Sequence, residues 1–206
     1  MDSTLPMFPL GSVLFPYMPV VLSVFEDRYL VMLSRILQDE PSEFGVVLIE
    51  RGQEVGGGEH RFTFGTVAQI SEIDTAEGSV VLVAKGERRI QITEWMPDDP
   101  YPLATVRQVA ELTWDDSLLP LREEADSAVR RALAAPSDSA DQEWPADIQL
   151  SEDPVAFAWQ LAAIAPIGQL DKVALLQSAT TEALLHGIIE FLEVSRDEFG
   201  AEWLAD

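Results

Sequence analysis

Two lysines limit the nucleophilic chemistry open to this chain. A serine–lysine dyad needs a lysine amine beside the serine, and Lys85 and Lys172 are the only lysines in the sequence. Lys85 stands beside Gly86 at the end of a predicted strand, whereas Lys172 follows Asp171 in the first turn of a predicted amphipathic helix. These positions favour a solvated or ion-paired role for each lysine over a catalytic one.

Two histidines are the bases that a serine–histidine–acid arrangement would use. His60 lies in a predicted glycine-rich loop, and His186 stands beside Leu185 on the last predicted helix. The Gly-x-Ser-x-Gly sequence of a nucleophile elbow does not occur. We therefore predict no catalytic residue. A hydrolase in which a serine or an acid pair converges on one of the histidines is the least favoured alternative.

Phosphate and metal sites are also not expected. Residues 56–58 form a glycine run, but Glu54 and Glu59 flank it and would repel phosphate, and no Gly-x-x-x-x-Gly-Lys-Ser/Thr sequence occurs. The paired acids at 98–99 and 115–116 lack the alternating oxygen ligands of a calcium loop. We read them as turns and helix caps, and we expect neither a metal nor a cofactor.

The charge of the chain restricts its partners. It has 206 residues, with 13 basic against 36 acidic side chains and a formal net charge of -23. Such a surface opposes phosphate backbones, so nucleic acid is not an expected partner. Cysteine is absent, the first residues carry no basic segment, and no apolar run reaches the roughly 18 residues of a membrane span. We expect an untargeted, cytoplasmic protein without membrane association.

The elements that would position a site fall into two halves. Residues 1–110 read as a strand-rich half, opening with an apolar run that four prolines interrupt and therefore confine to strand edges, starts or bulges. One helix is predicted at 27–38, with Tyr29, Leu33, Ile36 and Leu37 on its inner face. Further strands are predicted at 44–50, 62–73, 79–84, 88–95 and 104–109. In the strand at 88–95 Arg89 is expected to point away from Ile90 and Ile92.

Residues 111–206 read as a helical half, because the apolar period changes from two to 3.6 near residue 111. A first helix ends at Pro136, and a polar, acidic loop follows at 136–147. Asp153 and Pro154 give the signature of a helix start, with an N-cap residue followed by proline. Two further helices are predicted at 171–178 and 181–198.

Several motifs, in this order, resemble a known family. Leu-Pro-x-Phe-Pro-Leu at 5–10, Phe-Pro at 15–16 and Phe-Glu-x-Arg-Tyr at 25–29 are similar to the opening of the substrate-binding N-terminal domain of the ATP-dependent protease Lon, also called protease La. Further similarities are Phe-Gly-Val-Val-Leu-Ile at 44–49, Gly-Thr-x-Ala at 65–68, Gly-x-x-Arg at 86–89, Pro-Tyr at 100–101 and the Asp-Lys helix after the break at 166–168.

The resemblance implies a fold and a function. It implies an α+β fold: a partly open, small, PUA-like β-barrel with one helix, followed by a helical bundle, with domains at 1–110 and 111–206. It also implies a stand-alone, non-enzymatic module without the ATPase and protease domains, which recognises unfolded polypeptides or a specific protein as an adaptor or regulator in protein quality control. The alternative is a small-ligand or nucleic-acid-binding barrel, with Trp95 or Phe62 lining an apolar cavity.

Four residues are the predicted partner-binding site. Tyr17 and Met18 lie between Pro16 and Pro19, where an edge strand would accept an extended peptide, and packing into the fold is the competing interpretation. Asp27 and Arg28 open the first helix, either as a charge pair that contacts a partner or as capping residues. Trp144, in the acidic loop, is a further docking candidate that would otherwise pin its loop to the helices.

Overall fold

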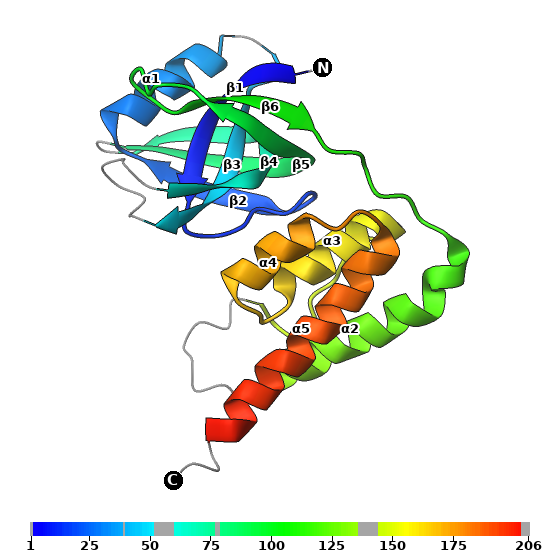
Figure 1. Cartoon of the computed structure of the whole chain (residues 1–206). Coiled ribbons are helices and arrows are strands. Elements are labelled where there is room, and N and C mark those ends of the chain that lie inside the picture. Colours follow the sequence, from blue (N-terminus) through cyan, green and yellow to red (C-terminus); the bar gives the residue numbers. More distant parts are fainter. Residues whose placement is uncertain (1, 39, 52–59, 77–78, 136–143, 203–206) are drawn as a thin grey trace. The chain divides into compact units, whose positions relative to one another are not determined.

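The computed structural model describes residues 2–38, 40–51, 60–76, 79–135 and 144–202. The chain forms two compact units, Met1–Glu111 and Leu112–Asp206. Figure 1 shows strands and one helix in the first unit and only helices in the second. The fold is therefore α+β, as predicted.

The first unit is built on a six-stranded mixed sheet. Its strands are β1 (Asp2–Leu10), β2 (Pro19–Val24), β3 (Glu43–Arg51), β4 (His60–Ala76), β5 (Ser79–Trp95) and β6 (Leu103–Gln108). Their order is β2-β5-β4-β3-β1-β6, and only the β1–β3 pair is parallel among these strands. An additional β5–β6 pairing joins β5, β4, β3, β1 and β6 into a ring. The partly open barrel remains a prediction for this ring.

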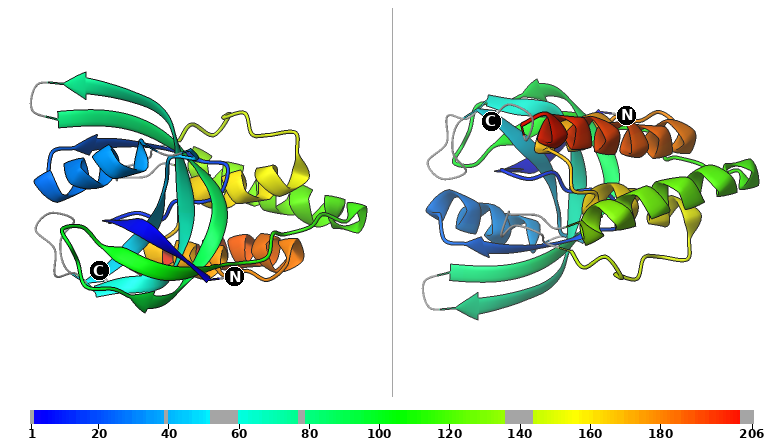
Figure 2. Two further views of the ribbon diagram at one scale, coloured as in Figure 1. Left: turned by 90° about the horizontal axis from the view of Figure 1, so that it is seen from above. Right: turned by 90° about the horizontal axis from the view of Figure 1, so that it is seen from below.

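The long strand β5 is shared between two partners on one side. Its first half pairs with β2, from Pro19 opposite Lys85 to Val24 opposite Val80, and its second half pairs with β6. Along its other side lies β4, and Figure 2 shows these two strands running together as a long ribbon. The strand β2 is thus an edge strand, because it pairs only with β5 among the described residues.

The core of this unit fills both sides of β1. On one side a cluster of buried side chains packs together: Met7, Val47, Val67, Ile90, Ile92, Ala104 and Val106. On the other side Phe8 stacks on Tyr29 of α1 (Asp27–Ile36), with ring centroids 4.0 Å apart, and also meets Phe44 of β3. Burial of aromatic rings is among the larger contributions that a core can make.

The helix prediction at 27–38 is confirmed, with an end two residues earlier, but its inner face differs. Met32 is fully buried beside Tyr29 and Leu33, whereas Leu37 is exposed. Leu37 follows the last helical residue, so the period of the helix no longer fixes where its side chain points.

One prediction about β5 was wrong. The predicted strands at 79–84 and 88–95 form one continuous strand, because Gly86 continues the strand rather than ending it. Arg89 is buried, but it lies on the face of β5 opposite to Ile90, as predicted, because the two residues follow one another in regular register against Thr66 and Gly65. A bulge precedes Arg89, since Thr66 pairs with Arg89 while Ala68 pairs with Gly86.

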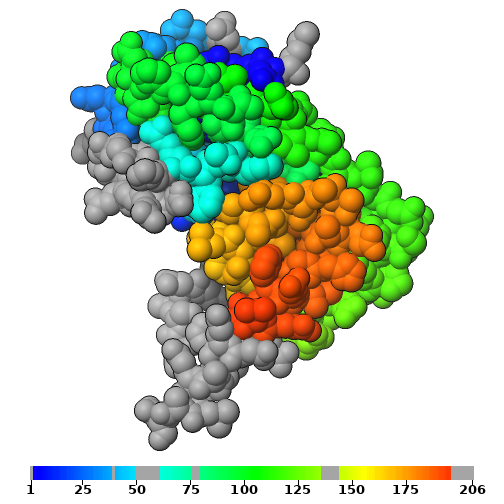
Figure 3. All heavy atoms as spheres, in the orientation of Figure 1, coloured from blue at the N-terminus to red at the C-terminus, as the bar shows by residue number. Residues whose placement is uncertain are grey.

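The second unit consists of a short 3-10 helix, η1 (Asp116–Leu118), and four longer helices in the described part. These are α2 (Leu119–Ala134), α3 (Pro154–Ile164), α4 (Gln169–Leu176) and α5 (Thr181–Glu202). The predicted cap of α3 is confirmed, because the Asp153 carboxylate accepts a hydrogen bond from the Ala156 amide at 2.8 Å. Most of α3 is buried, and α5 contacts α2, α3 and α4. Figure 3 shows α4 and α5 forming one continuous surface.

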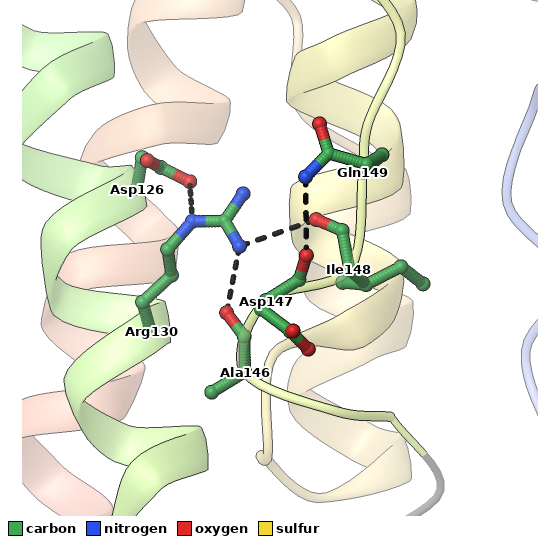
Figure 4. Close-up of polar contacts among 6 residues, drawn as sticks. All are labelled: Asp126, Arg130, Ala146, Asp147, Ile148 and Gln149. Carbon is green, nitrogen blue, oxygen red and sulfur yellow. Dashed lines mark hydrogen bonds and ion pairs between the residues drawn. The ribbon is translucent and has the colours of Figure 1, made fainter.

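Arg130 of α2 ties down the segment that precedes α3. Its guanidinium donates to the carbonyl oxygens of Ala146 and Ile148 at 2.7 and 3.2 Å, and also to the Asp126 carboxylate at 2.9 Å (Figure 4). Trp144 lies half-buried in the same segment. Residues 136–143 of the predicted acidic loop lie outside the described residues. The helical bundle remains a prediction for this unit.

Candidate polypeptide-binding edge

The turn before β2 is fastened to the sheet by a buried threonine. The Thr66 hydroxyl, on β4, donates to the Leu14 carbonyl at 2.6 Å. Thr66 is fully buried and Leu14 nearly so. A buried hydrogen bond of this kind fixes the backbone that carries the next residues of the turn.

Gly86 of β5 holds the next part of the turn through two backbone bonds. Its carbonyl accepts from the Tyr17 amide at 2.7 Å, and its amide donates to the Met18 carbonyl at 2.8 Å. A Cβ atom at Gly86 would overlap the Phe15 carbonyl oxygen. The glycine is therefore required here for close approach of two backbones, not for a turn.

Tyr17 has a left-handed backbone conformation, with φ of 65°. A non-glycine residue pays roughly 1–2 kcal/mol for this conformation, so its surroundings must impose it, and such residues cluster at functional sites. The ring is 37% exposed, and the Lys85 ammonium lies 5.6 Å from its centroid. The turn thus presents one aromatic ring to solvent in a fixed place.

Met18 differs from Tyr17 in its exposure. Its side chain is only 8% exposed, so it packs into the fold as the competing interpretation expected, and it is not open to a partner in this structure. The backbone of Met18 instead holds the turn, because its amide donates to the Phe15 carbonyl and its carbonyl accepts from the Gly86 amide.

Glu26 and Arg28 form an ion pair at the start of α1, at 3.1 Å. The guanidinium of Arg28 also lies over the Tyr29 ring, 4.5 Å from its centroid. The Glu26 carbonyl accepts from the Tyr29 and Leu30 amides, so Glu26 caps the helix with its backbone. Asp27 is exposed, where its charge favours the positive end of the helix.

The four predicted site residues do not converge on one point. Tyr17 and Met18 precede β2, whereas Asp27 and Arg28 follow it, and a strand of six residues spans about 20 Å. The strand between them carries exposed apolar residues that our sequence analysis did not select. Val21 on β2 is 66% exposed and Phe25, just after it, is 56% exposed. The proline-bounded edge strand in the sequence was the signal for Val21.

The Gly-x-x-Arg motif at 86–89 lies on β5, the strand that pairs with β2. Arg88 makes a two-pronged ion pair with Glu43 of β3, at 2.8 and 2.6 Å, and this hydrogen bond raises the pKa of Arg88 above its usual value. Arg89 donates to the Ala110 carbonyl at 2.7 Å, while burial lowers the pKa of Arg89. The motif is therefore structural at three of its four positions.

The other candidates for chemistry have structural positions or stay exposed. Lys172 donates to the Ala163 carbonyl at 2.8 Å, which caps the end of α3. Lys85 pairs with Glu87 at 3.5 Å. His186 is exposed on α5, and the side chain of His60 lies outside the described residues. In the described ranges, no three acidic or histidine side chains come together as a metal site would need.

No described helix is both long enough and apolar enough to cross a membrane.

Comparison with solved structures shows the same fold. A Lon N-terminal domain protein from Xanthomonas campestris aligns with a TM-score of 0.63 and 24% identity, over 92% of this chain and 98% of that one. The N-terminal domain of the Mycobacterium avium complex Lon protease aligns with a TM-score of 0.65 and 19% identity, over 93% and 98% of the two chains.

Two curated relatives match about half of the chain. A LON peptidase N-terminal domain and RING finger protein of Schizosaccharomyces pombe is 24% identical over 120 residues, which are 52% of this chain and 24% of that protein. The Lon protease of Flavobacterium johnsoniae is 26% identical over 116 residues, which are 55% of this chain and 14% of that protein. The match therefore spans a quarter or less of each relative's length.

The family comparison covers far more of the chain. The family model described as the ATP-dependent protease La (LON) substrate-binding domain matches residues 4–194, through both compact units. This confirms the resemblance that the motifs indicated. The chain belongs to the Lon substrate-binding domain family.

Proposed function

We propose that this chain recognises extended polypeptide segments, from unfolded chains or a specific protein partner, and does so as a cytoplasmic adaptor or regulator that neither hydrolyses ATP nor cleaves peptides. Membership of a substrate-binding domain family supports protein recognition. The relatives named above join related sequences to a protease or to a RING finger, which supports a place in protein turnover.

The observation that carries the proposal is the exposed apolar surface along β2 and the turn before it. Tyr17, Val21 and Phe25 expose apolar side chains within nine residues of one another. Exposed apolar groups at a strand edge suit an extended peptide, which needs backbone partners and shallow side-chain contacts. The proposed site keeps Tyr17, Asp27 and Arg28 as partner contacts, while the buried Met18 fixes the turn that presents Tyr17.

The alternative of a ligand-binding barrel has less support. Phe62 and Trp95, which it would place along an apolar cavity, pack against the core cluster around Met7 and Ile90. Trp95 is also covered by the Arg61 guanidinium, 4.5 Å from its ring centroid. These rings are occupied in packing.

Amide-shift mapping by NMR with unfolded casein tests the proposal. We expect shifts at residues 17–28 and an affinity that is micromolar or weaker, because a shallow edge must offset the ordering of a flexible peptide. Tyr17→Ala should weaken binding, whereas Leu170→Ala, which removes a more exposed apolar side chain on α4, should not. Shifts confined to the helical unit, or cleavage of casein, would contradict the proposal.

A further inference from the structure

The outer side of β2 has no partner strand in the described part of the chain. The strand pairs with β5 from Pro19 to Val24 and with nothing on its other side. Figure 2 shows the β4–β5 ribbon along its paired side. An unpaired edge presents a row of amide and carbonyl groups that another strand can join.

The register identifies which backbone groups face outward. The Gly86 amide donates to the Met18 carbonyl, so Met18 is at a hydrogen-bonded position of the ladder. These positions alternate in an antiparallel pair, so Val20, Leu22 and Val24 also bond to β5. Pro19, Val21 and Ser23 then turn their backbone groups away from β5. Pro19 has no amide hydrogen to lose at its outward position.

The strand β4 also has a free edge, in the part that runs beyond its pairing with β3. That edge is protected from pairing with another strand, whereas the edge of β2 is not. Pairing of β4 with β3 ends at Gln69, and the stretch of β4 beyond it carries a bulge after Ile70 and the acidic residues Glu72 and Asp74. Charges and bulges are the features that keep a free edge from pairing. The sequence of β2, Pro-Val-Val-Leu-Ser-Val, has no charge and its pairing has no register shift.

Charge favours a basic occupant over a second copy of this chain. Asp27 lies exposed just beyond β2, and the cations Arg28 and Lys85 already pair with Glu26 and Glu87. A second copy would bring another chain with a net charge of -23 against the first. An extended segment with a lysine or arginine near Asp27 would instead be attracted by the negative charge of this chain.

We infer that the outer edge of β2 accepts an extended, apolar and basic polypeptide segment as an added strand. The Pro19 carbonyl and the backbone groups of Val21 and Ser23 bond to it. The apolar side chains of the segment lie beside Val21 and Phe25, and its basic residue lies near Asp27. This inference rests on the proposed function and names the class of polypeptide and its binding mode.

Proline at an outward position tests the inference. Ser23→Pro removes one outward amide hydrogen and leaves the bonds to β5 in place, while Ser23→Ala is the matched control that keeps the amide. The probe is a synthetic peptide with alternating valine and lysine, measured by fluorescence anisotropy. We expect Ser23→Pro to weaken its binding about tenfold, the effect of one lost strong hydrogen bond, and Ser23→Ala to change it less than about twofold.

A second measurement uses the unaltered protein, in case the proline variant fails to fold. The same peptide is N-methylated at either of its two alternating sets of amides. Because only one set can bond to β2, we expect one methylated peptide to lose binding and the other to keep it. A glutamate version of the peptide should bind more weakly, and the difference should shrink at high salt.

The outcomes separate the inference from the proposed function. If binding is unchanged in Ser23→Pro and with both methylated peptides, the outer edge of β2 is not the binding site. The recognition function would then still stand. Failure of the unaltered protein to bind any extended peptide overturns both. A dimer that Ser23→Pro abolishes would assign the edge to a second copy and overturn the choice of occupant.

Discussion

The Thr66 hydroxyl donates to the Leu14 carbonyl across 2.6 Å, and this buried bond joins the middle of β4 to the turn that precedes β2. Thr66 belongs to the Gly-Thr-x-Ala motif, and Leu14 precedes the Phe-Pro motif, so two motifs far apart in the sequence meet at one bond. The bond fixes the turn that presents Tyr17.

Thr66→Val should lower the free energy of unfolding by about 1–3 kcal/mol, because it leaves the Leu14 carbonyl buried without its donor while the volume stays the same. Denaturant unfolding measures the change. Thr93→Val is the control, since Thr93 makes the same kind of bond, to the Thr105 carbonyl, at an exposed position. Equal losses in both variants would show that burial of the Thr66 bond has no special importance.

Gly86→Ala should cost about 1–3 kcal/mol of stability and displace the turn, because the new methyl group meets the Phe15 carbonyl. The amide signals of Tyr17 and Met18 should move in the NMR spectrum. Gly168→Ala serves as control, since the nearest atom to a Cβ there is the Asp171 Oδ2 at 3.3 Å. An unchanged Tyr17 signal in Gly86→Ala would contradict the role of Gly86 as anchor.

Local chemistry was predictable from the sequence where it is determined within a few residues. Asp153 and Pro154 identify the start of α3, because an N-cap oxygen and a proline act within one turn. The helix α1 followed from its apolar spacing in the same way. The family motifs placed the whole chain in its fold class.

Features that depend on distant partners were not predictable. The left-handed Tyr17 follows from its bond to Gly86, which is 69 positions away in the chain numbering and invisible in local spacing. The burial of Arg89 goes with its bond to the Ala110 carbonyl, 21 positions along the chain, which strand alternation does not reveal. The free edge of β2 became evident only when its single partner, β5, was known.

Arg130→Met should free the segment before α3, because it removes the bonds to the Ala146 and Ile148 carbonyls but keeps the aliphatic stem. We expect faster hydrogen exchange at residues 144–149 and a loss of about 1–2 kcal/mol. Arg131→Met changes the exposed neighbour on the same helix and should have neither effect. Unchanged hydrogen exchange at residues 144–149 in Arg130→Met would show that the Arg130 bonds do not hold this segment in place.

The pair of Asp2 and Arg107 should give the first unit a pH dependence in acid. Its two bonds, at 3.0 and 3.2 Å, join β1 to β6, and the hydrogen bond with Arg107 holds the pKa of Asp2 below its usual value. A lowered carboxyl pKa stabilises the fold above the unfolded pKa of about 3.9, and the stabilisation is lost as the pH falls through the lower folded value.

Unfolding midpoints of the wild type and Asp2→Asn, measured from pH 7 to pH 2, check this dependence. The wild type should be the more stable at neutral pH. The difference between the two unfolding midpoints should disappear below about pH 4. Arg107→Gln should reproduce the behaviour of Asp2→Asn. A gap that stays constant over this range would assign the difference to something other than the ionised carboxylate.

Separate fragments should keep the secondary structure of each compact unit. The units meet between Glu111 and Leu112, and the apolar period changes from two to 3.6 at that point in the sequence. The core cluster of the first unit draws its residues from strands of that unit, and α3 of the second contacts α2, α4 and α5 of its own unit. We therefore propose two folding domains and expect circular dichroism of 1–111 to show strand and that of 112–206 to show helix. The summed spectra should match that of the whole chain, and a mainly helical or unfolded first fragment would mean that its ring of strands depends on the second unit.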